Sequence, residues 1–431
     1  MAAQSGRSNE NVVIDVQSSL VSSLNVELRD ACISMHQSYC IFNIPSILFR
    51  HNESSFLPNC FSIGPMHRGK QHLVAVEKIK LKYLKGLLCR VNESKQIEEQ
   101  KVLSDLVNAV NSIEKQASAC YAGHDFAEEL GDEFVKTMLL DGVFLIELFR
   151  RGVEQEKETD DPIFSMSCML QYLHHDLILL ENQIPWLVLE TLFEKTRIPC
   201  ENKSTLIKHA LSFFANTFTS DQPKTSCFKE GQEIKHILDL LRLSLVLPSQ
   251  ENKNKPKAGW QPIRSATRLK EAGINFKKGE ADSVLDIKFK DGCVEIPPLL
   301  IQETTETIFR NLIAYEQCLP HCLPIFTCYA KLLDGLIDTN DDMEILCKRD
   351  IFDNWLGLED STKFFNNLYN DTYVKEFYYS ELSDKLDDHC RTWWPRWRAA
   401  LVHNYFTKPW AMVALVYAVI MFGLTLWQAI K

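Results

Sequence analysis

The sequence predicts a mainly α-helical protein, a large helical head with a small β-hairpin element and one C-terminal transmembrane helix. Three observations lead to this fold class. Apolar residues recur every three or four positions over much of the 431-residue chain, which is the spacing of amphipathic helices. Asp291-Gly292 stands between two β-branched runs, the pattern of a two-residue hairpin. The stretch from Trp410 to Ile430 contains no charged side chain.

The N-terminal part divides into a polar start and a helical lobe. Residues 1–22 are polar, and we expect them to be disordered. Residues 23–248 are expected to form the helical lobe. Its clearest elements are an antiparallel helix pair, at 70–91 and 103–117, and an almost wholly apolar helical region from 126 to 149.

A polar interruption divides the most apolar stretch of this lobe. One helix is expected to run through Leu180, to break at Glu181-Asn182-Gln183 and to be followed by a second helix with Pro185 in its first turn. Further helices are expected at 203–219 and 233–246.

A charged linker and a second lobe follow. Residues 249–258, SQENKNKPKA, are predicted to be the linker. Residues 259–406 are expected to form a second helical lobe that includes the hairpin. Its helices are predicted at 304–319, at 323–337 and from Val374 to Trp397, with a kink at Pro395.

Residues 409–430 are predicted to span a membrane. At about 1.5 Å per residue, a helix of this length reaches roughly 32 Å, about the thickness of a bilayer's hydrocarbon core. Trp410 and Trp427 stand near its two ends, where aromatic rings prefer the membrane interface. The alternative interpretation is a buried core helix.

Charge and cysteine usage place the head in the cytosol. The N-terminus lacks a signal peptide, and basic residues precede the anchor whereas only Lys431 follows it. The fourteen cysteines are scattered, many of them through apolar patterns, as expected for reduced thiols. The opposite orientation stays open because four N-x-S/T sequons begin at Asn52, Asn92, Asn202 and Asn370.

The net charge of −10 disfavours nucleic acid as a partner, because binding to a phosphate backbone depends on clustered Lys and Arg. The expected partners are therefore the lipid bilayer, through residues 409–430, and another protein. No catalytic, cofactor-binding or metal residue is assigned.

Two motifs resemble ligand sites only in part. The loop from Gly64 to Gln71 has the spacing of a phosphate-binding loop, but Pro65 removes one N–H group and Gln71 replaces the hydroxyl that binds Mg²⁺. A turn that enters a helix is the favoured interpretation. The second motif consists of Cys318, His321, Cys322 and Cys328. These residue types could bind a metal ion, but their spacing favours buried thiols.

Two further groups have a chemical and a structural interpretation. A general acid–base cluster before Pro185 would use His174, His175, Asp176 and Glu181. The favoured alternative is that Glu181, Asn182 and Gln183 satisfy backbone groups where two helices meet. A basic helix face that would contact anionic lipid, or simply be solvated, carries Lys78, Lys80, Lys82, Lys85 and Arg90.

Several blocks in order resemble the plant family called domain of unknown function 247: FSIGPMHRGKQHL, DLILLENQIPWLVLETLF, LKEAGINFK, NLIAYEQC and YFTKPWAMVALVYAVIMFGLTLWQ. Met66 departs from the aromatic residue expected at its position. The resemblance implies a flowering-plant source, a single-pass membrane location and, from members associated with grass self-incompatibility loci, a recognition role. It carries over no catalytic residue. We therefore expect a membrane-anchored recognition or signalling protein; the alternative is a membrane-tethered enzyme with a pocket near residues 174–185.

Overall fold

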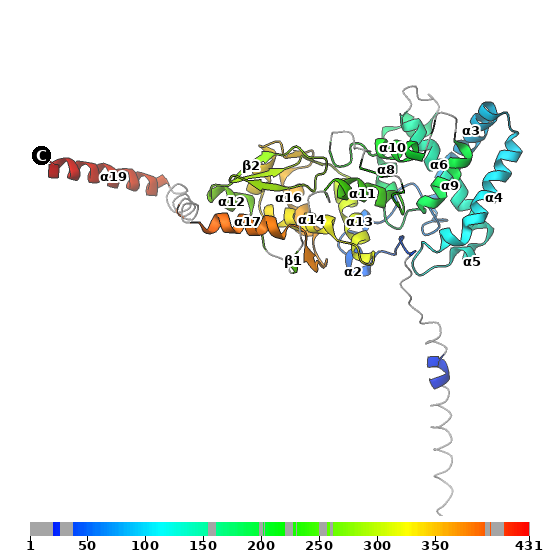
Figure 1. Cartoon of the computed structure of the whole chain (residues 1–431), viewed down its shortest axis with the longest axis horizontal. Coiled ribbons are helices and arrows are strands. Elements are labelled where there is room, and N and C mark those ends of the chain that lie inside the picture. Colours follow the sequence, from blue (N-terminus) through cyan, green and yellow to red (C-terminus); the bar gives the residue numbers. More distant parts are fainter. Residues whose placement is uncertain are drawn as a thin grey trace, which may run out of the picture. The chain divides into compact units, whose positions relative to one another are not determined.

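The computed structural model describes residues 20–25, 38–153, 161–197, 201, 203–219, 227–229, 231–249, 257–258, 262–392, 397 and 409–430. The chain forms two compact units, Met1–Tyr39 and Cys40–Lys431. In the first unit, residues 20–25 are helical, and the rest of the predicted disordered start lies outside the described residues. All elements named below belong to the second unit (Figure 1).

One apolar helix, α6 (Asp132–Val153), is central to the first part of the second unit. Nearly every side chain from Phe134 to Arg150 is buried, because other helices cover the helix on several sides. The helices that pack on it are α3 (Glu77–Lys95), α4 (Glu99–Ser118), α5 (Phe126–Leu130), α9 (Trp186–Thr196) and α10 (Lys203–Phe213) (Figure 1).

The contact between α6 and α9 depends on Gly142. A Cβ atom at this position would lie 2.4 Å from Leu192 Cδ1, closer than real Cβ atoms approach. The missing side chain therefore allows the two helices to pack closely.

The predicted antiparallel pair is present as α3 and α4, which contact each other and are joined by residues 96–98. Its first helix starts at Glu77 instead of residue 70, after the short 3₁₀ turn η2 (Val74–Val76). The predicted region from 126 to 149 is divided at Gly131, whose φ of 53° ends α5 before α6 begins.

The predicted polar break is also present. α8 (Ser167–Leu177) ends three residues before the expected end at Leu180, and α9 begins directly after Pro185. Three short elements complete this part: α2 (Ser46–Phe49), η1 (Glu53–Ser55) and α7 (Pro162–Ser165).

The remaining part of the unit is also mainly helical. α13 (Thr305–Cys318) and α14 (Ile325–Leu336) lie within their predicted ranges, and α11 (Ile237–Ser249) begins four residues later than predicted. The other helices of this part are α12 (Ala266–Glu271), α15 (Asn340–Cys347), α16 (Leu358–Leu368) and α17 (Ser380–Arg391).

The predicted hairpin is confirmed. β3 (Lys288–Lys290) pairs antiparallel with β4 (Cys293–Ile296), and Phe289 lies opposite Val294. The two turn residues have positive φ, 51° for Asp291 and 73° for Gly292, as a type I′ turn requires. β2 (Asn275–Lys278) adds a parallel strand, so the order is β2-β4-β3. β5 (Leu299–Ile301) and β6 (Phe352–Asn354) form a separate parallel pair.

The prediction of a long helix from Val374 to Trp397 is wrong in its first part. β7 (Glu376–Phe377) pairs antiparallel with β1 (Lys257–Ala258), and α17 begins only at Ser380. The aromatic residues at 377–379 are all buried, and Tyr379 donates a hydrogen bond to the Leu285 carbonyl at 2.6 Å. These tertiary contacts favour extended backbone over the helical period. The predicted kink at Pro395 lies outside the described residues.

The predicted linker at 249–258 is described only at its ends, where Ser249 ends α11 and residues 257–258 form β1. Its residues 250–256 lie outside the described part. The division into lobes 23–248 and 259–406 stays a prediction.

α19 (Pro409–Ile430) forms a helix where the transmembrane segment was predicted. Within the described part of the chain, however, no helix has the length and apolar character that crossing a membrane requires. Polar groups interrupt the apolar run at Tyr417, Thr425 and Gln428, and the Thr425 hydroxyl bonds the Met421 carbonyl at 2.9 Å. The prediction of a transmembrane helix at residues 409–430 is therefore not supported.

Candidate functional site

A buried carboxylate holds the loop that precedes α3. Asp176, at the end of α8, is 0% exposed and accepts hydrogen bonds from three consecutive backbone N–H groups. These are the N–H groups of Asn59 at 2.8 Å, Cys60 at 2.8 Å and Phe61 at 2.7 Å. Because buried N–H groups need partners, Asp176 fixes the course of the loop.

Asn182 and Gln183 complete the same attachment. The Asn182 side chain accepts from Ile63 N at 2.7 Å and donates to the Phe61 carbonyl at 2.8 Å. The Gln183 amide donates to the carbonyls of Leu177 and Leu179, both at 2.8 Å, where α8 ends. The interpretation that these polar residues satisfy backbone groups between two buried helices is thus confirmed.

Asn311 of α13 joins the break to a third segment. Its side-chain oxygen accepts from Leu180 N at 2.9 Å, and its nitrogen donates to the Ser55 carbonyl at 2.7 Å. One buried amide therefore connects segments that are more than a hundred residues apart in the sequence.

The loop with phosphate-loop spacing is turned inward. Gly64 N–H donates to Asp141 Oδ2 at 2.8 Å, and a Cβ atom on Gly64 would lie 2.4 Å from the Gln183 carbonyl oxygen. Asp141 also pairs with Lys80 Nζ at 2.6 Å, and its burial raises the pKa of the Asp141 carboxyl. The first glycine of the loop is thus bound to a buried carboxylate, which supports the interpretation of a turn that enters a helix.

His67 links this loop to Glu181. The Lys70 ammonium donates a hydrogen bond to His67 Nδ1 at 2.7 Å. The ring proton of His67 therefore lies on Nε2, which is 3.3 Å from Glu181 Oε2. Glu181 Oε1 accepts from Ile44 N at 2.7 Å. Burial raises the pKa of Glu181, but the hydrogen bonds from His67 and Ile44 outweigh it, so the net shift is downward.

The proposed acid–base cluster is only partly brought together. His175 Nδ1 lies 2.9 Å from Asp176 Oδ1, but Asp176 is already bound to the loop backbone. The His174 ring packs instead on Phe213, with centroids 4.4 Å apart, and burial lowers the pKa of His174 to about 4. The side chains predicted to share a site therefore face different segments.

The cysteine group near residue 320 consists of protonated thiols. Burial raises the pKa of Cys318 to about 11 and those of Cys322 and Cys328 to about 12. Cys328 Sγ donates to the Glu376 carbonyl at 3.5 Å. Across the described residues, no three His, Cys, Asp or Glu side chains are placed to hold a metal ion.

The predicted basic face of α3 is smaller than its sequence indicates. Lys80 is 1% exposed and ion-paired with Asp141, and Arg90 pairs with Glu147 at 2.7 Å. The exposed basic residues of this group are Lys78, Lys82 and Lys85.

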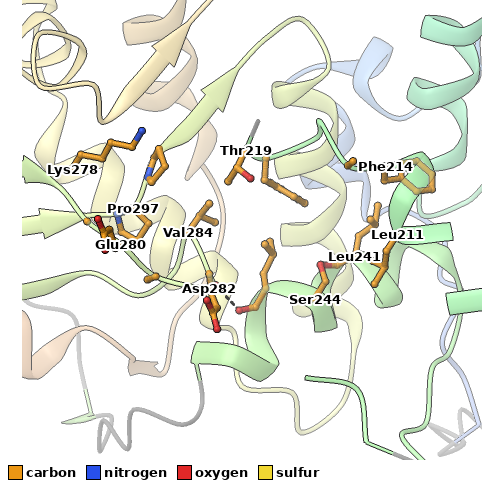
Figure 2. Close-up of a pocket in the computed structure, with 17 residues that line it drawn as sticks. Leu211, Phe214, Thr219, Leu241, Ser244, Lys278, Glu280, Asp282, Val284 and Pro297 are labelled. Atoms are coloured by element: carbon orange, nitrogen blue, oxygen red, sulfur yellow. Dashed lines mark hydrogen bonds between the residues drawn. The ribbon is translucent and has the colours of Figure 1, made fainter. Parts of the chain in front are cut away.

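A cleft of about 510 Å³ lies elsewhere, between the end of α10, the helix α11 and the loop 279–284. One wall is apolar and includes Leu211, Phe214 and Leu241. Lys278 and Glu280 stand on the opposite side, as Figure 2 shows, and both side chains are exposed. Its volume lies within the range of small-ligand pockets, about 300–1,000 Å³.

Hydrogen bonds to backbone carbonyls fix both walls of this cleft. Gly279 N donates to the Ile296 carbonyl at 2.8 Å, and Ser283 Oγ donates to the Leu245 carbonyl at 2.5 Å. On the other side, Leu300 N donates to the Phe218 carbonyl at 2.8 Å. The cleft is therefore a preformed feature of the fold.

The cleft lining combines an apolar wall with charged side chains, which stand on the exposed rim. This cleft was not predictable from the sequence because its residues come from four separated segments. The turn signals at Gly279 and Pro297-Pro298 were the only local indication.

The comparisons with known proteins agree over nearly the whole chain. The family model DUF247, described as a plant protein of unknown function, matches residues 41–424. UPF0481 protein At3g47200 of Arabidopsis thaliana is 27% identical over 423 residues, covering 91% of this chain and 86% of the relative. Putative UPF0481 protein At3g02645 of the same plant is 23% identical over 510 residues, covering 95% and 92%. No solved structure was found to match the chain.

Proposed function

This chain belongs to the DUF247 family of plant proteins of unknown function, and we propose that it is a recognition protein that binds a segment of another protein in the cleft beside loop 279–284. The observation that carries the proposal is the cleft itself, preformed and with an apolar wall facing a charged rim (Figure 2). An apolar side chain of the partner would bury against Leu211, Phe214 and Leu241.

The rim defines the charge of this partner. Glu280 and Asp282 are acidic and Lys278 is basic, so the exposed rim carries a net negative charge. Charge complementarity then favours a basic residue beside the apolar anchor of the bound segment.

The alternative of an enzyme with a site near residues 174–185 has less support. The polar side chains there are bound to backbone groups of the loop and of the helix ends. Groups that hold the fold together in this way are not free to converge on a substrate.

A cleft-filling substitution tests the proposal. Wild-type protein should enrich peptides with an apolar residue next to Lys or Arg from a phage-displayed random library, and Ala215→Trp should abolish that enrichment because the indole fills the cleft. Ala75→Trp, on the exposed 3₁₀ turn η2, is the matched control and should retain it. Equal enrichment by both variants would refute the cleft as the binding site. Proximity labelling in plant cells with the same two variants would identify the natural partner.

We further propose that α19 attaches the protein to a lipid bilayer. Most of its described side chains are apolar and exposed, for example Val419 at 64%, Phe422 at 67% and Trp427 at 70%. Burying this surface in lipid would remove it from water.

Vesicle flotation of the full-length protein tests the bilayer proposal. Val419→Asp should reduce vesicle binding roughly a hundredfold, since a carboxylate at the centre of an apolar helix costs about 3 kcal/mol in the membrane. Val74→Asp makes the same change at a residue of η2 that is 53% exposed, and should leave flotation unchanged. Flotation of the Val419→Asp variant at the wild-type level would contradict the proposal.

We also propose that the helical head faces the cytosol. The cysteines that the structure describes are free thiols, as expected in a reducing compartment. Asn52, in the first sequon, donates its side-chain amide to Glu306 Oε1 at 2.8 Å, a bond that a glycan at this nitrogen would disturb. Endoglycosidase-sensitive sugar on Asn52, Asn92, Asn202 or Asn370 in plant cells would place the head outside the cytosol.

A further inference from the structure

Two cysteines far apart in the sequence are neighbours across a short parallel pairing. Ile41 forms a parallel bridge with Tyr121, Cys40 N donates to the Cys120 carbonyl at 2.9 Å, and Ala122 N donates to the Ile41 carbonyl at 2.9 Å. The register places Cys40 beside Cys120. Neighbouring strands lie about 4.8 Å apart, within the Cα separation of about 4.4–6.8 Å found in disulfides.

The two thiols contact each other and differ in exposure. A side-chain hydrogen bond joins them, while Cys120 Sγ lies 3.4 Å from the Gln116 carbonyl as its donor. Cys40 must therefore donate to the Cys120 sulfur. Cys40 is 1% exposed, whereas Cys120 is half-buried and accessible to a small reagent.

This arrangement makes the accessible thiol the more acidic one. The hydrogen bond from Cys40 lowers the pKa of Cys120. Burial raises this pKa and the charge of Lys235 lowers it, so the net shift is downward. The same hydrogen bond raises the pKa of Cys40, together with its burial. The thiolate forms on Cys120, next to a thiol that stays protonated.

Hydrogen bonds fix the backbone on both sides of the pair. His236 Nε2 donates to the Cys40 carbonyl at 3.0 Å, since His236 Nδ1 accepts from Asp239 N at 3.2 Å. Tyr121, next to Cys120, donates its hydroxyl to the Gln183 carbonyl at 3.0 Å. The chain that carries the two cysteines is therefore held in place on both sides.

We propose that Cys40 and Cys120 form a redox-active dithiol that a peroxide converts to a disulfide. The Cys120 thiolate attacks one oxygen of hydrogen peroxide, the O–O bond breaks, and Cys120 sulfenic acid and hydroxide form. The Cys40 sulfur then attacks the sulfenic sulfur, and the hydroxyl leaves as water with the Cys40 proton. Overall, two thiols are oxidised to a disulfide and one peroxide is reduced to two waters.

The disulfide would fasten Cys40, the first residue of the second compact unit, to Cys120, two residues after the C-terminal end of α4. The backbone there is already paired, so oxidation would lock an existing contact instead of creating a new one. We therefore expect oxidation to slow the local opening of residues 40–41 and 120–122 while the rest of the fold stays unchanged.

Peptide mapping of the full-length protein tests the proposal. After treatment with limiting hydrogen peroxide, alkylation and digestion, the first cross-linked species should join the peptides containing Cys40 and Cys120. Cys347→Ser should leave this link unchanged, because Cys347 lies on α15 in another part of the fold. In Cys40→Ser, dimedone should trap sulfenic acid on Cys120, and in Cys120→Ser the Cys40 thiol should resist the same dose.

The mapping on wild-type protein needs no substitution, so it remains decisive if Cys40→Ser fails to fold. Absence of the Cys40–Cys120 link at peroxide doses that oxidise other cysteines would overturn the proposal. Dimedone labelling that spreads equally over the exposed thiols would also overturn it, because the selectivity for Cys120 would be lost.

Discussion

The polar break between α8 and α9 and the cleft beside loop 279–284 use charged and polar residues in opposite ways. At the break, Asp176 and Asn182 are 0% exposed, and their side chains form hydrogen bonds with backbone groups. At the cleft, Lys278 and Glu280 are exposed beside an apolar wall. The environment, and not the residue type, therefore separates a polar group that holds a fold from one that is available to a ligand.

The largest effect is expected at the buried ion pair behind the break. Asp141→Ala removes one of the two carboxylates that pair with the Lys80 ammonium, which is 1% exposed, and leaves only Glu77 at 2.6 Å; it also removes the buried acceptor of Gly64 N. Breaking such a pair should cost about 3–5 kcal/mol of unfolding free energy. Denaturant unfolding measures the loss, and Asp105→Ala, on the exposed face of α4, should leave the midpoint close to wild type. A small loss for Asp141→Ala would show that the pair does not support the loop.

Glu181→Ala should have the next largest effect. It removes the acceptor of Ile44 N and the partner of His67, so a cost of about 1–3 kcal/mol is expected. Because the folded-state pKa of Glu181 is lowered, its contribution is present above the unfolded pKa of about 4.3 and disappears as the pH falls through the folded value. The free energies of unfolding of the wild-type protein and of Glu181→Ala should therefore converge as the pH falls through this acidic range. An unchanged midpoint with lost binding would instead mark Glu181 as a functional residue.

A smaller effect is expected from the pH dependence of His174. Burial lowers its pKa to about 4, so the unfolded chain binds a proton below about pH 6.5 that the folded protein does not accept. Stability should therefore fall by about 1 kcal/mol between about pH 7 and pH 5.5. His174→Phe keeps an aromatic ring against Phe213 and should remove this part of the pH dependence. An identical pH profile in both proteins would contradict the buried neutral state of His174.

The smallest stability effect is expected at the cleft rim. Lys278→Glu should change the unfolding free energy by less than about 0.5 kcal/mol, because the side chain is exposed. It should nevertheless strengthen the preference of the cleft for basic peptides, whereas Lys363→Glu on the exposed face of α16 should not. A large loss of stability for Lys278→Glu would remove the contrast between the two regions.

The sequence predicted those elements whose signals are local. The hairpin followed from Asp291-Gly292, and the helix pair α3 and α4 followed from apolar spacing. The order of β2 and β4, the pair of β5 with β6, and the strand at residues 376–377 were not predictable in this way, because each depends on a partner far along the chain. Three consecutive buried aromatic residues also fit the apolar pattern of a helix, which explains the wrong assignment there.

The sequence predicted the role of the polar break better than it predicted a binding site. Glu181, Asn182 and Gln183 stand where two apolar helices meet, so a structural role was deducible from their position. The cleft was not deducible, since Leu211, Leu241 and Glu280 belong to segments that only tertiary packing joins. The inward orientation of Lys80 was equally hidden, because a basic residue on an amphipathic helix is normally solvated.

The side chain of Asn311 has a consequence for the order in which the chain folds during synthesis. Leu180 N and the Ser55 carbonyl receive their buried partner only when α13 has been made. At about 5–20 residues per second, the ribosome needs roughly 3–14 s to extend the chain from residue 248 to residue 318. During this interval, the helices from α2 to α11 have an incomplete core. Chaperones that bind apolar surfaces should therefore associate with nascent chains of this length and release them once α13 docks.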